Sequence, residues 1–394
     1  MSQKEVLRRL GRQFSDHFGR RHTVAAYAPG RVEVLGNHTD YNEGFVLSAA
    51  INLGTTFIAA PSPDSSCRLV AGDLMEEVSF DVTSGARAEK NNWSNYVKGV
   101  SAKLHARSKS ATGFLGMFLG NLPLGAGLAS SAALEMASGL ALSSLYGADV
   151  PNLDLARIGQ AAEHEFAGVK CGLLDQISSL FGREGQLVMS DFRTLKVDNV
   201  PLGEDACFLM CNTNAKHSLV NSAYNERRAK CEEAARFFAS VLKHPVTALR
   251  DVTWDEWQTH SSEMDPVTAR RAAHVVGENT RVLRGRELLK RGDLAGFGRL
   301  MFESHESSFA NFENSCRELD FLVSLAKKIP GVLGARLSGG GFGGSVVVLL
   351  HPRDAETAGQ ALASAYQKEF THPCDVRIIK PSAGARLIPP ASGA

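Results

Sequence analysis

The segment Leu122-Pro123-Leu124-Gly125-Ala126-Gly127-Leu128-Ala129-Ser130-Ser131-Ala132-Ala133 joins a glycine-rich turn to the start of a helix of small residues. Glycine lets a backbone approach a ligand closely, and the free N–H groups and dipole of a helix start attract phosphate. Because no Gly-Lys-Ser/Thr follows, this is not a Walker A loop. Ser130 and Ser131 can donate to phosphate oxygens, and Glu135, one helical turn after Ser131, can share Mg²⁺ with it. An ordinary serine cap after a glycine-rich turn is the alternative, and both interpretations stay open at this point.

Strands and helices alternate irregularly on both sides of this segment. Before it, the periodicity predicts a helix at 7–18 and strands at 24–28, 32–35, 45–51, 55–60, 67–71 and 77–82. From 130 onward it predicts helices at 130–147, 154–166, 173–181, 218–242 and 355–370, and strands at 207–212, 332–337, 345–350 and 375–379. Without a steady strand–helix–strand repeat, the pattern favours an α+β fold over a doubly wound sheet. The interruption near 195–205 predicts two domains, residues 1–198 and 199–394.

Length and composition narrow the class of protein. The chain has 394 residues, a formal net charge of +1, 44% hydrophobic residues and 22% charged residues. This balance gives no sign of a nucleic-acid or membrane-surface protein, and no apolar run approaches the roughly 18–20 residues of a membrane span. Residues 1–20 lack the apolar stretch of a secretory signal, and seven scattered cysteines indicate neither a disulfide framework nor a zinc site. We therefore expect a cytoplasmic protein, and a monomer.

A second glycine cluster is Ser338-Gly339-Gly340-Gly341-Phe342-Gly343-Gly344. Its spacing satisfies Gly-x-Gly-x-x-Gly, but an apolar strand at 346–350 follows where a dinucleotide-binding fold would begin a helix. A tight hairpin turn is the simpler interpretation. The cluster nevertheless holds more glycines than a turn requires, which favours backbone that lies next to a ligand.

Two shorter segments carry polar groups that suit a sugar. The segment 30–42 ends a strand in a loop that bears Asn37, His38 and Asp40, an amide, an imidazole and a carboxylate within four residues. A plain turn with side-chain-to-backbone hydrogen bonds is the alternative there. In the helix at 173–181, Asp175 lies on the polar face with Ser178 and Ser179, so that it is either solvated or lines a cleft.

Taken together, these segments resemble the GHMP small-molecule kinases, and the galactokinase group most closely. The matching blocks are the sugar-recognition signature at 30–42, an adenine-pocket segment at 93–100, the phosphate loop at 123–133, the segment of the catalytic aspartate at 171–176, a second-domain segment at 212–228 and the third glycine motif at 335–344. They follow the family's order, which chance similarity to one glycine-rich loop would not reproduce.

The resemblance implies a ribosomal protein S5 domain 2-like N-terminal domain and a ferredoxin-like C-terminal domain, with the active site between them. It implies ATP, with cofactor-binding residues Trp93, Tyr96, Gly125, Gly127, Ser130, Ser131, Gly340 and Gly341, and Mg²⁺ near Ser131 and Glu135. It implies a sugar held by Asn37, His38, Asp40, Gly172, Asp175 and Tyr224.

Phosphoryl transfer to a hydroxyl requires in-line positioning, charge neutralisation and help with one proton. The resemblance makes Asp175 the base or electrostatic anchor for the C1 hydroxyl, and Arg31 the group that keeps Asp175 ionised and offsets charge on the γ-phosphate. Two positions depart from the family. Asn37 replaces a glutamate, which puts recognition of the C6 end of the sugar in question, and Ala129 replaces the first of three serines, which leaves Ser130 and Ser131 for phosphate.

The leading hypothesis is therefore a galactose 1-kinase that uses Mg²⁺ and ATP. The residue at 37 motivates an alternative, a 1-kinase for a related sugar such as arabinose, a uronic acid or N-acetylgalactosamine. A catalytically silent sugar and ATP sensor is the alternative from another class, and the presence of Arg31, Asp175 and the two serines argues against it.

Overall fold

The computed structural model describes residues 3–83, 88–89, 92–108, 112–123, 125–215 and 220–389. Within these ranges, an eight-stranded mixed sheet forms the first half of the molecule. Its strands are β1 (Val24–Leu35), β2 (Phe45–Pro61), β3 (Ser66–Ala71), β4 (Glu76–Asp81), β5 (Phe114–Gly120), β6 (Gln186–Asp191), β7 (Lys196–Pro201) and β12 (Arg386–Leu387). The order is β12-β1-β2-β5-β3-β4, and β6 pairs with β2 and with β7.

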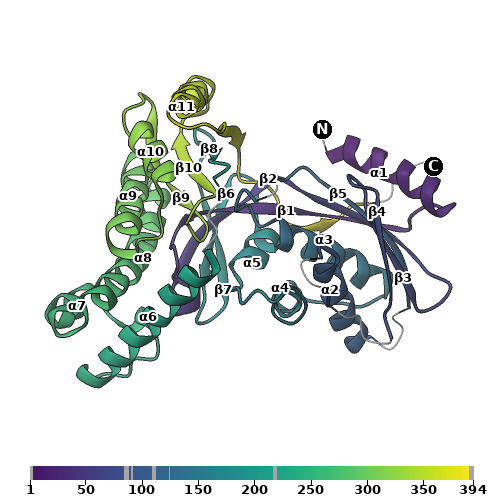
Figure 1. Cartoon of the computed structure of the whole chain (residues 1–394), viewed down its shortest axis with the longest axis horizontal. Coiled ribbons are helices and arrows are strands. Elements are labelled where there is room, and N and C mark those ends of the chain that lie inside the picture. The colour runs from purple at the N-terminus through teal and green to yellow at the C-terminus, as the bar shows by residue number, and fades with distance from the viewer. Residues whose placement is uncertain are drawn as a thin grey trace.

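Helices cover both faces of this sheet (Figure 1). Helix α1 (Gln3–Phe18) lies on one face, and α2 (Ser94–Arg107), α3 (Ser130–Leu145), α4 (Asn152–Ala162) and α5 (Leu174–Phe181) lie on the other. The alternation of β2 explains the two layers, because Phe57 and Ala59 pack toward α2–α5 while Ile58 and Ala60 pack toward α1.

The second half is built on a four-stranded antiparallel sheet with the order β11-β8-β10-β9, counted over the same described ranges. The strands are β8 (Cys207–Asn212), β9 (Val332–Ser338), β10 (Ser345–Leu350) and β11 (Asp375–Ile379). The helices are α6 (Val220–Val241), α7 (Trp254–His260), α8 (Pro266–Lys290), α9 (Leu294–Ser307), α10 (Arg317–Ala326) and α11 (Ala355–Glu369). Helices α10 and α11 cover one face of this sheet.

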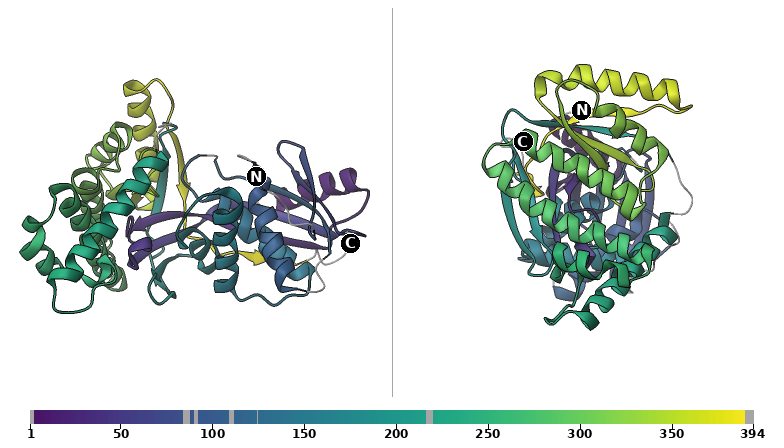
Figure 2. Two further views of the ribbon diagram at one scale, coloured as in Figure 1. Left: turned by 60° about the horizontal axis from the view of Figure 1, so that its bottom comes forward. Right: turned by 90° about the vertical axis from the view of Figure 1, so that its left-hand side faces the viewer.

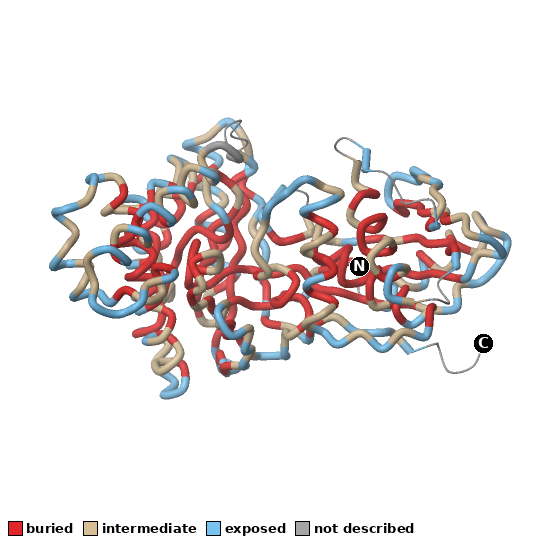
Figure 3. The backbone as a smooth tube through the Cα atoms, turned by 90° about the horizontal axis from the view of Figure 1, so that it is seen from below, coloured by how far each residue is buried: buried red, intermediate tan, exposed pale blue. Residues whose placement is uncertain are grey.

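A shared apolar core joins the two halves. The far end of β1, with Val32 and Val34, packs in one cluster with Val347 and Leu349 of β10 and with Phe297 of α9. The molecule is elongated, with the helices of the second half gathered at one end (Figure 2). Buried backbone runs from one half into the other (Figure 3). The loop that follows β1 therefore lies where the halves meet.

The observed elements differ from the predicted ones in two main ways: α2, β5, β6 and β7 were not predicted, and the first two strands are longer than expected. The strands predicted at 24–28 and 32–35 are one strand, β1, and those at 45–51 and 55–60 are one strand, β2. Irregular pairing between Pro29 and Arg31 lets β1 continue past Pro29-Gly30 without breaking. As a result, one strand reaches from the helix-covered sheet to the second half.

Several boundaries also differ. Helix α4 ends at Ala162 and continues as a wider π-helical turn, Glu163–Ala167, before Gly168 ends it. The start predicted for α6 at 218 lies outside the described residues, as do 216, 217 and 219 of the matching segment and Leu124 of the phosphate loop. The predicted domain division at 198/199 falls inside β7, and the chain changes sheets between Pro201 and Cys207. No described helix is both long and apolar enough to cross a membrane.

Candidate active site

A cavity of about 590 Å³ lies where β1, the loop after it, the start of α5, the start of α6 and the turn between β9 and β10 meet. It is lined by Arg31, Glu33, Asn37, His38, Asp40, Gly168, Val169, Lys170, Cys171, Gly172, Leu174, Asp175, Tyr224, Asn225, Gly339 and Gly340. The structure thus brings all seven residues predicted for catalysis and sugar binding to one place.

Arg31 and Asp175 form the polar centre of this cavity. The Nε and Nη2 groups of Arg31 lie 2.8 and 2.7 Å from Oδ1 of Asp175, and Nη1 donates to the carbonyl of Gly127 at 2.5 Å. Arg31 is 7% exposed, and the side chain of Asp175 is 26% exposed. Asp175 is therefore not a solvated surface aspartate. The polar face of α5 that carries Asp175 continues toward the sheet, where the hydroxyl of Ser178 bonds to that of Ser48 in β2.

The phosphate loop has the backbone that its glycines predict. Gly125 and Gly127 both have φ of +70°, and Ala129 has φ of 56° immediately before α3 begins at Ser130. Left-handed backbone at these positions favours glycine and turns the chain into the helix start. Through Gly127 and Arg31, this loop is tied to Asp175.

The second glycine cluster lies against the phosphate loop. Ser345, which follows the cluster, donates through Oγ to the carbonyl of Ala126 at 2.7 Å. Gly340 lines the cavity, whereas Gly341 packs against Asn314, whose carbonyl accepts from the N–H of Phe342 at 2.6 Å. A nucleotide contact by Gly340 or Gly341 stays a prediction.

The carboxylate beside Ser131 is Glu163 and not Glu135. Ser131 donates through Oγ to Oε1 of Glu163 at 3.0 Å. Glu135 is fully buried, accepts from Gln176 at 3.0 Å, and has no partner at Oε1 among the described residues. Burial, and next the charge of Glu163, raise the pKa of Glu135 well above its ordinary value. The structure thus places Glu163 rather than Glu135 at the hydroxyl of Ser131, and contact of Glu135 with Mg²⁺ stays a prediction.

Sequence reasoning missed Glu163 because this residue stands outside every motif described above. The signal that reveals Glu163 is its place in the π-helical turn after α4, which brings it to the start of α3. No cluster of three or more His, Cys, Asp or Glu side chains among the described residues could hold a metal by itself. Mg²⁺ commonly binds one or two carboxylates together with substrate phosphates, and the hydroxyl and carboxylate oxygens of Ser131 and Glu163 are donors of the hard type that it prefers.

His38 and Asp40 form the wall of the cavity at the loop after β1. The ring of His38 bonds through Nδ1 to the hydroxyl of Tyr41 at 2.8 Å and through Nε2 to the carbonyl of Gly340 at 3.0 Å, and burial lowers its pKa to about 4. Burial raises the pKa of Asp40 to about 6, and Glu33 and Asp175 add to the effect. A side chain at Gly172 would collide with the carboxylate of Asp40, so that position requires glycine.

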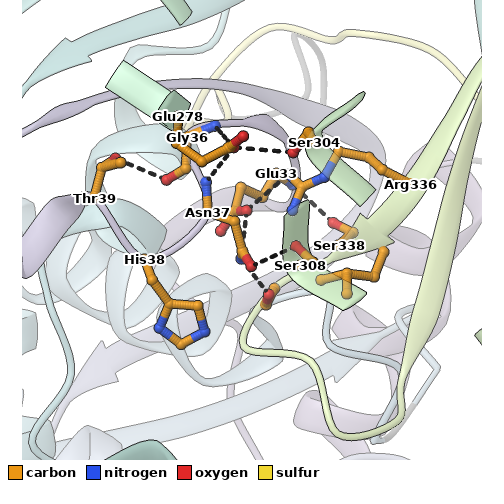
Figure 4. Close-up of polar contacts among 12 residues, drawn as sticks. Glu33, Gly36, Asn37, His38, Thr39, Glu278, Ser304, Ser308, Arg336 and Ser338 are labelled. Carbon is orange, nitrogen blue, oxygen red and sulfur yellow. Dashed lines mark hydrogen bonds and ion pairs between the residues drawn. The ribbon is translucent and has the colours of Figure 1, made fainter. Parts of the chain in front are cut away.

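Asn37 reaches the cavity but is held by the protein on every side (Figure 4). Its amide nitrogen donates to Oε1 of Glu33 and to the carbonyl of Gly339, both at 2.8 Å. Its amide oxygen accepts from Asn314 at 2.8 Å and from Ser308 at 3.5 Å. It is 1% exposed.

Glu278 of α8 fixes the backbone of this loop and was not anticipated from the sequence. Its Oε2 accepts from the N–H groups of Gly36 and Asn37 at 2.9 and 3.0 Å and from Ser304 at 2.9 Å (Figure 4). Its Oε1 accepts from Arg281. Burial alone would raise the pKa of Glu278, but Arg281 and other cationic groups hold it below its ordinary value.

Tyr224, predicted for the sugar, lines the cavity, whereas the residues predicted for the adenine lie outside it. The ring of Tyr224, on α6, lies 5.2 Å from that of His38, and burial raises the pKa of its hydroxyl. Trp93, just before α2, donates through Nε1 to Glu76 at 3.1 Å and packs on Phe118. Neither Trp93 nor Tyr96 lines the cavity described here, and their contact with a nucleotide stays a prediction.

Known proteins resemble the chain along most of its length. Three family models match: the galactokinase galactose-binding signature at residues 12–61, the GHMP kinases N terminal domain at 95–183 and the GHMP kinases C terminal at 286–368. The crystal structure of Lactococcus lactis galactokinase complexed with galactose has a TM-score of 0.91 and 33% identity, covering 97% of this chain and 99% of that one.

More distant structures share the fold alone. Methanococcus jannaschii mevalonate kinase has a TM-score of 0.62 and 18% identity over 91% of this chain and 98% of that one. A D-glycero-D-manno-heptose 1-phosphate kinase from Bacteriodes thetaiotaomicron has a TM-score of 0.62 and 16% identity over 94% and 100%. The two-domain α+β architecture is common to these kinases and to this chain.

Proposed function

The chain belongs to the galactokinase group of the GHMP kinase family, and we propose that it transfers the γ-phosphate of ATP to the C1 hydroxyl of galactose, giving galactose 1-phosphate. Membership makes it a sugar kinase with ATP as phosphate donor. The contact between Arg31 and Asp175 carries the finer proposal. It joins a cavity large enough for a sugar to a glycine-rich helix start suited to phosphate.

The chemistry assigned to these two residues follows from their contact. A sugar hydroxyl is a weak nucleophile, and the transferred phosphoryl group carries negative charge on its equatorial oxygens. Asp175 accepts a hydrogen bond from the C1 hydroxyl and receives its proton. Arg31, which contacts Asp175 and the phosphate loop together, fixes the position of the carboxylate and offsets charge on the phosphoryl group.

The nucleotide is assigned to the two glycine clusters and to α2. Its phosphates would contact Gly125, Gly127, Ser130 and Ser131, its adenine would lie near Trp93 and Tyr96, and Gly340 and Gly341 would close the site from the second half. Ser131 and Glu163 would hold Mg²⁺, since they supply two oxygen donors 3.0 Å apart. When bound, Mg²⁺ neutralises phosphate charge.

A panel of sugars tests the proposal. The protein is incubated with Mg²⁺ and ATP and with galactose, arabinose, galacturonic acid or N-acetylgalactosamine, ADP release is followed, and the phosphorylated carbon is located by NMR. We expect galactose to give the highest kcat/KM and a phosphate at C1. Galactose turning over no better than the others would favour a kinase for a related sugar, and no turnover with tight ATP binding would favour a sensor.

The monomeric state expected from the sequence is a separate proposal. Light scattering after size-exclusion chromatography checks it, and a mass near 42.3 kDa is the expected result. A mass near twice that value would contradict it.

A further inference from the structure

Glu33 lies on the same face of β1 as Arg31 and lines the same cavity. Alternate residues of a strand share a face and lie about 7 Å apart along it. Pairing with β2 is regular from Arg31 to Glu33, so no bulge disturbs this spacing. The distance is comparable with that across a sugar ring with its hydroxyls. If the acceptor hydroxyl sits at Asp175 and Arg31, the opposite side of the ring therefore comes toward Glu33.

The carboxylate of Glu33 has one oxygen committed and one free of protein partners. Oε1 accepts from the amide of Asn37 at 2.8 Å and from Nη1 of Arg336 at 2.9 Å (Figure 4). Among the described residues, no donor contacts Oε2 of Glu33. The side chain is only 4% exposed, yet the residue lines the cavity. A carboxylate oxygen at a cavity wall without a protein donor is open to a donor from a ligand or from water.

Asn37 is in the opposite situation. An amide side chain has two N–H donors and two acceptor lone pairs, and all four are used by Glu33, Gly339, Asn314 and Ser308. For Asn37 to bind a sugar hydroxyl, it would have to release one of these buried partners, which costs the free energy of leaving a polar group unpaired.

We propose that Glu33 binds and selects the sugar, its Oε2 accepting a hydrogen bond from the hydroxyl across the ring from the phosphorylated one, and that Asn37 is a positioning residue that orients Glu33. This inference rests on the proposed function, because it takes the sugar to be the occupant of the cavity. It moves the contact predicted for residue 37 to residue 33.

The charges around Glu33 define the class of sugar that this contact accepts. Arg336 is fully buried and balances the charge of Glu33, while Arg31 is engaged by Asp175. Asp40 adds a further carboxyl group to the cavity. Lys170 also lines the cavity, but it is exposed, and the carboxyl groups of Glu33, Asp40 and Asp175 outnumber it. A sugar carboxylate placed at Glu33 would therefore meet mainly negative charge. The site selects neutral sugars and rejects uronic acids.

The test crosses protein variants with sugar variants. Wild type, Glu33→Gln and Asn37→Ser are assayed with galactose, with its 2-, 3-, 4- and 6-deoxy analogues and with galacturonic acid. In wild type, we expect one analogue to lose at least about tenfold in kcat/KM because the free oxygen of Glu33 loses its donor. In Glu33→Gln, the KM for galactose should rise about tenfold with a smaller change in kcat, and the penalty for that one analogue should shrink to about threefold or less.

Asn37→Ser serves as the matched variant, since it alters the neighbour of Glu33 and keeps the carboxylate. It should raise the KM for every sugar and keep the wild-type ranking of the analogues. Discrimination against galacturonic acid should relax about tenfold in Glu33→Gln alone. An unchanged analogue pattern in Glu33→Gln, or its loss in Asn37→Ser only, would overturn the proposal.

Two further measurements keep the outcome decisive. Glu33→Asp retains the charge that pairs with Arg336 and withdraws the carboxylate from the cavity, so it should reproduce the selective loss if Glu33→Gln does not fold. Circular dichroism and ATP binding without sugar verify that each variant is folded. If wild type phosphorylates none of the sugars, the proposed function fails, whereas activity with an unaltered analogue pattern refutes only the role of Glu33.

Discussion

Asp175 is the residue on which turnover should depend most. Asp175→Asn keeps an oxygen where Arg31 donates but removes the negative charge and the capacity to take a proton. We expect kcat to fall by about a thousandfold or more, while the affinity for ATP stays within about threefold. A coupled assay of ADP release and calorimetric titration with ATP measure the two quantities.

A matched control for this change is Asp198→Asn, in β7. The side chain of Asp198 is 55% exposed and pairs only with Lys196, at 3.6 Å, within the described residues. The Asp198→Asn variant should keep the wild-type kcat and the wild-type affinity for ATP. An Asp175→Asn enzyme with near-normal turnover would contradict the role of Asp175 and would leave Arg31 without the partner that the mechanism assigns to it.

Asp40 should make the stability of the sugar-free protein depend on pH. Its pKa is about 6 in the folded protein against an ordinary value of 3.8, so the folded state holds the proton more tightly. The contribution of this carboxyl to stability is fully present below pH 3.8 and is lost as the pH rises through about 6. The free energy of unfolding of Asp40→Asn, relative to that of wild type, should therefore rise by up to about 3 kcal/mol between pH 4 and pH 7. Urea unfolding of both proteins across this range measures the difference, and a difference independent of pH would contradict the shift.

The sequence identified those site residues that stand in contiguous motifs, and it missed those that act through distant partners. Asn37, His38, Asp40 and Asp175 are conspicuous because several polar groups or a polar helix face occur together. Glu33 shows its importance only through Arg336, which is 303 residues away in the chain. Whether Asp175 was solvated or faced a cleft depended on Arg31, which only the packing of α5 against β1 brings into contact.

Helix α8 holds the loop after β1 in place through Glu278. Glu278→Ala would leave the N–H groups of Gly36 and Asn37 and the charge of Arg281 without their buried partner. We expect the free energy of unfolding to fall by about 3–5 kcal/mol and the KM for sugar to rise, because the loop carries the sugar-binding wall. Denaturant unfolding and steady-state kinetics test both effects.

Glu287 on the same helix provides the comparison. Its side chain is 47% exposed and pairs with Arg286 and Lys290 at the surface. Glu287→Ala should leave the free energy of unfolding close to its wild-type value, because exposed ion pairs contribute little. If Glu278→Ala and Glu287→Ala lowered the free energy of unfolding equally, the loss would come from the charge pattern of α8 and not from the contacts of Glu278 with the loop after β1.

The strands β1 and β2 show what local periodicity cannot determine. Each was predicted as two strands, divided at 29–31 and at 52–54. In the folded protein, the irregular pairing at Pro29 keeps the ladder between β1 and β2 intact across the break. This continuity matters for the site, because the same strand packs under α3 and carries Arg31 and Glu33 to the junction of the two halves.

The two halves are joined in ways that no single segment reveals. The chain crosses from the first sheet to the second after Pro201, and β12 then returns to pair with β1. The periodicity located most helices and strands, but pairing order is set by contacts between distant segments, so the return of the tail could not be read from it. Consequently, the halves should unfold together rather than one after the other.

Gly384 tests whether this returning tail stabilises the whole molecule. Its N–H donates to the carbonyl of Gly182 at 2.8 Å, and a Cβ at this position would lie 2.5 Å from the carbonyl oxygen of Leu180, at the end of α5. Gly384→Ala should push the tail from α5 and β1 and lower the free energy of unfolding by about 1–3 kcal/mol in one cooperative transition.

Gly11→Ala is the control, because a Cβ there meets only His22 at 3.4 Å and alanine favours helix α1 by up to about 1 kcal/mol. The midpoints of thermal and denaturant unfolding should therefore fall in Gly384→Ala and rise in Gly11→Ala. Two separate transitions in Gly384→Ala, or stability equal to wild type, would show that the halves do not depend on the tail, and that the shared core beside β1 is enough to hold them.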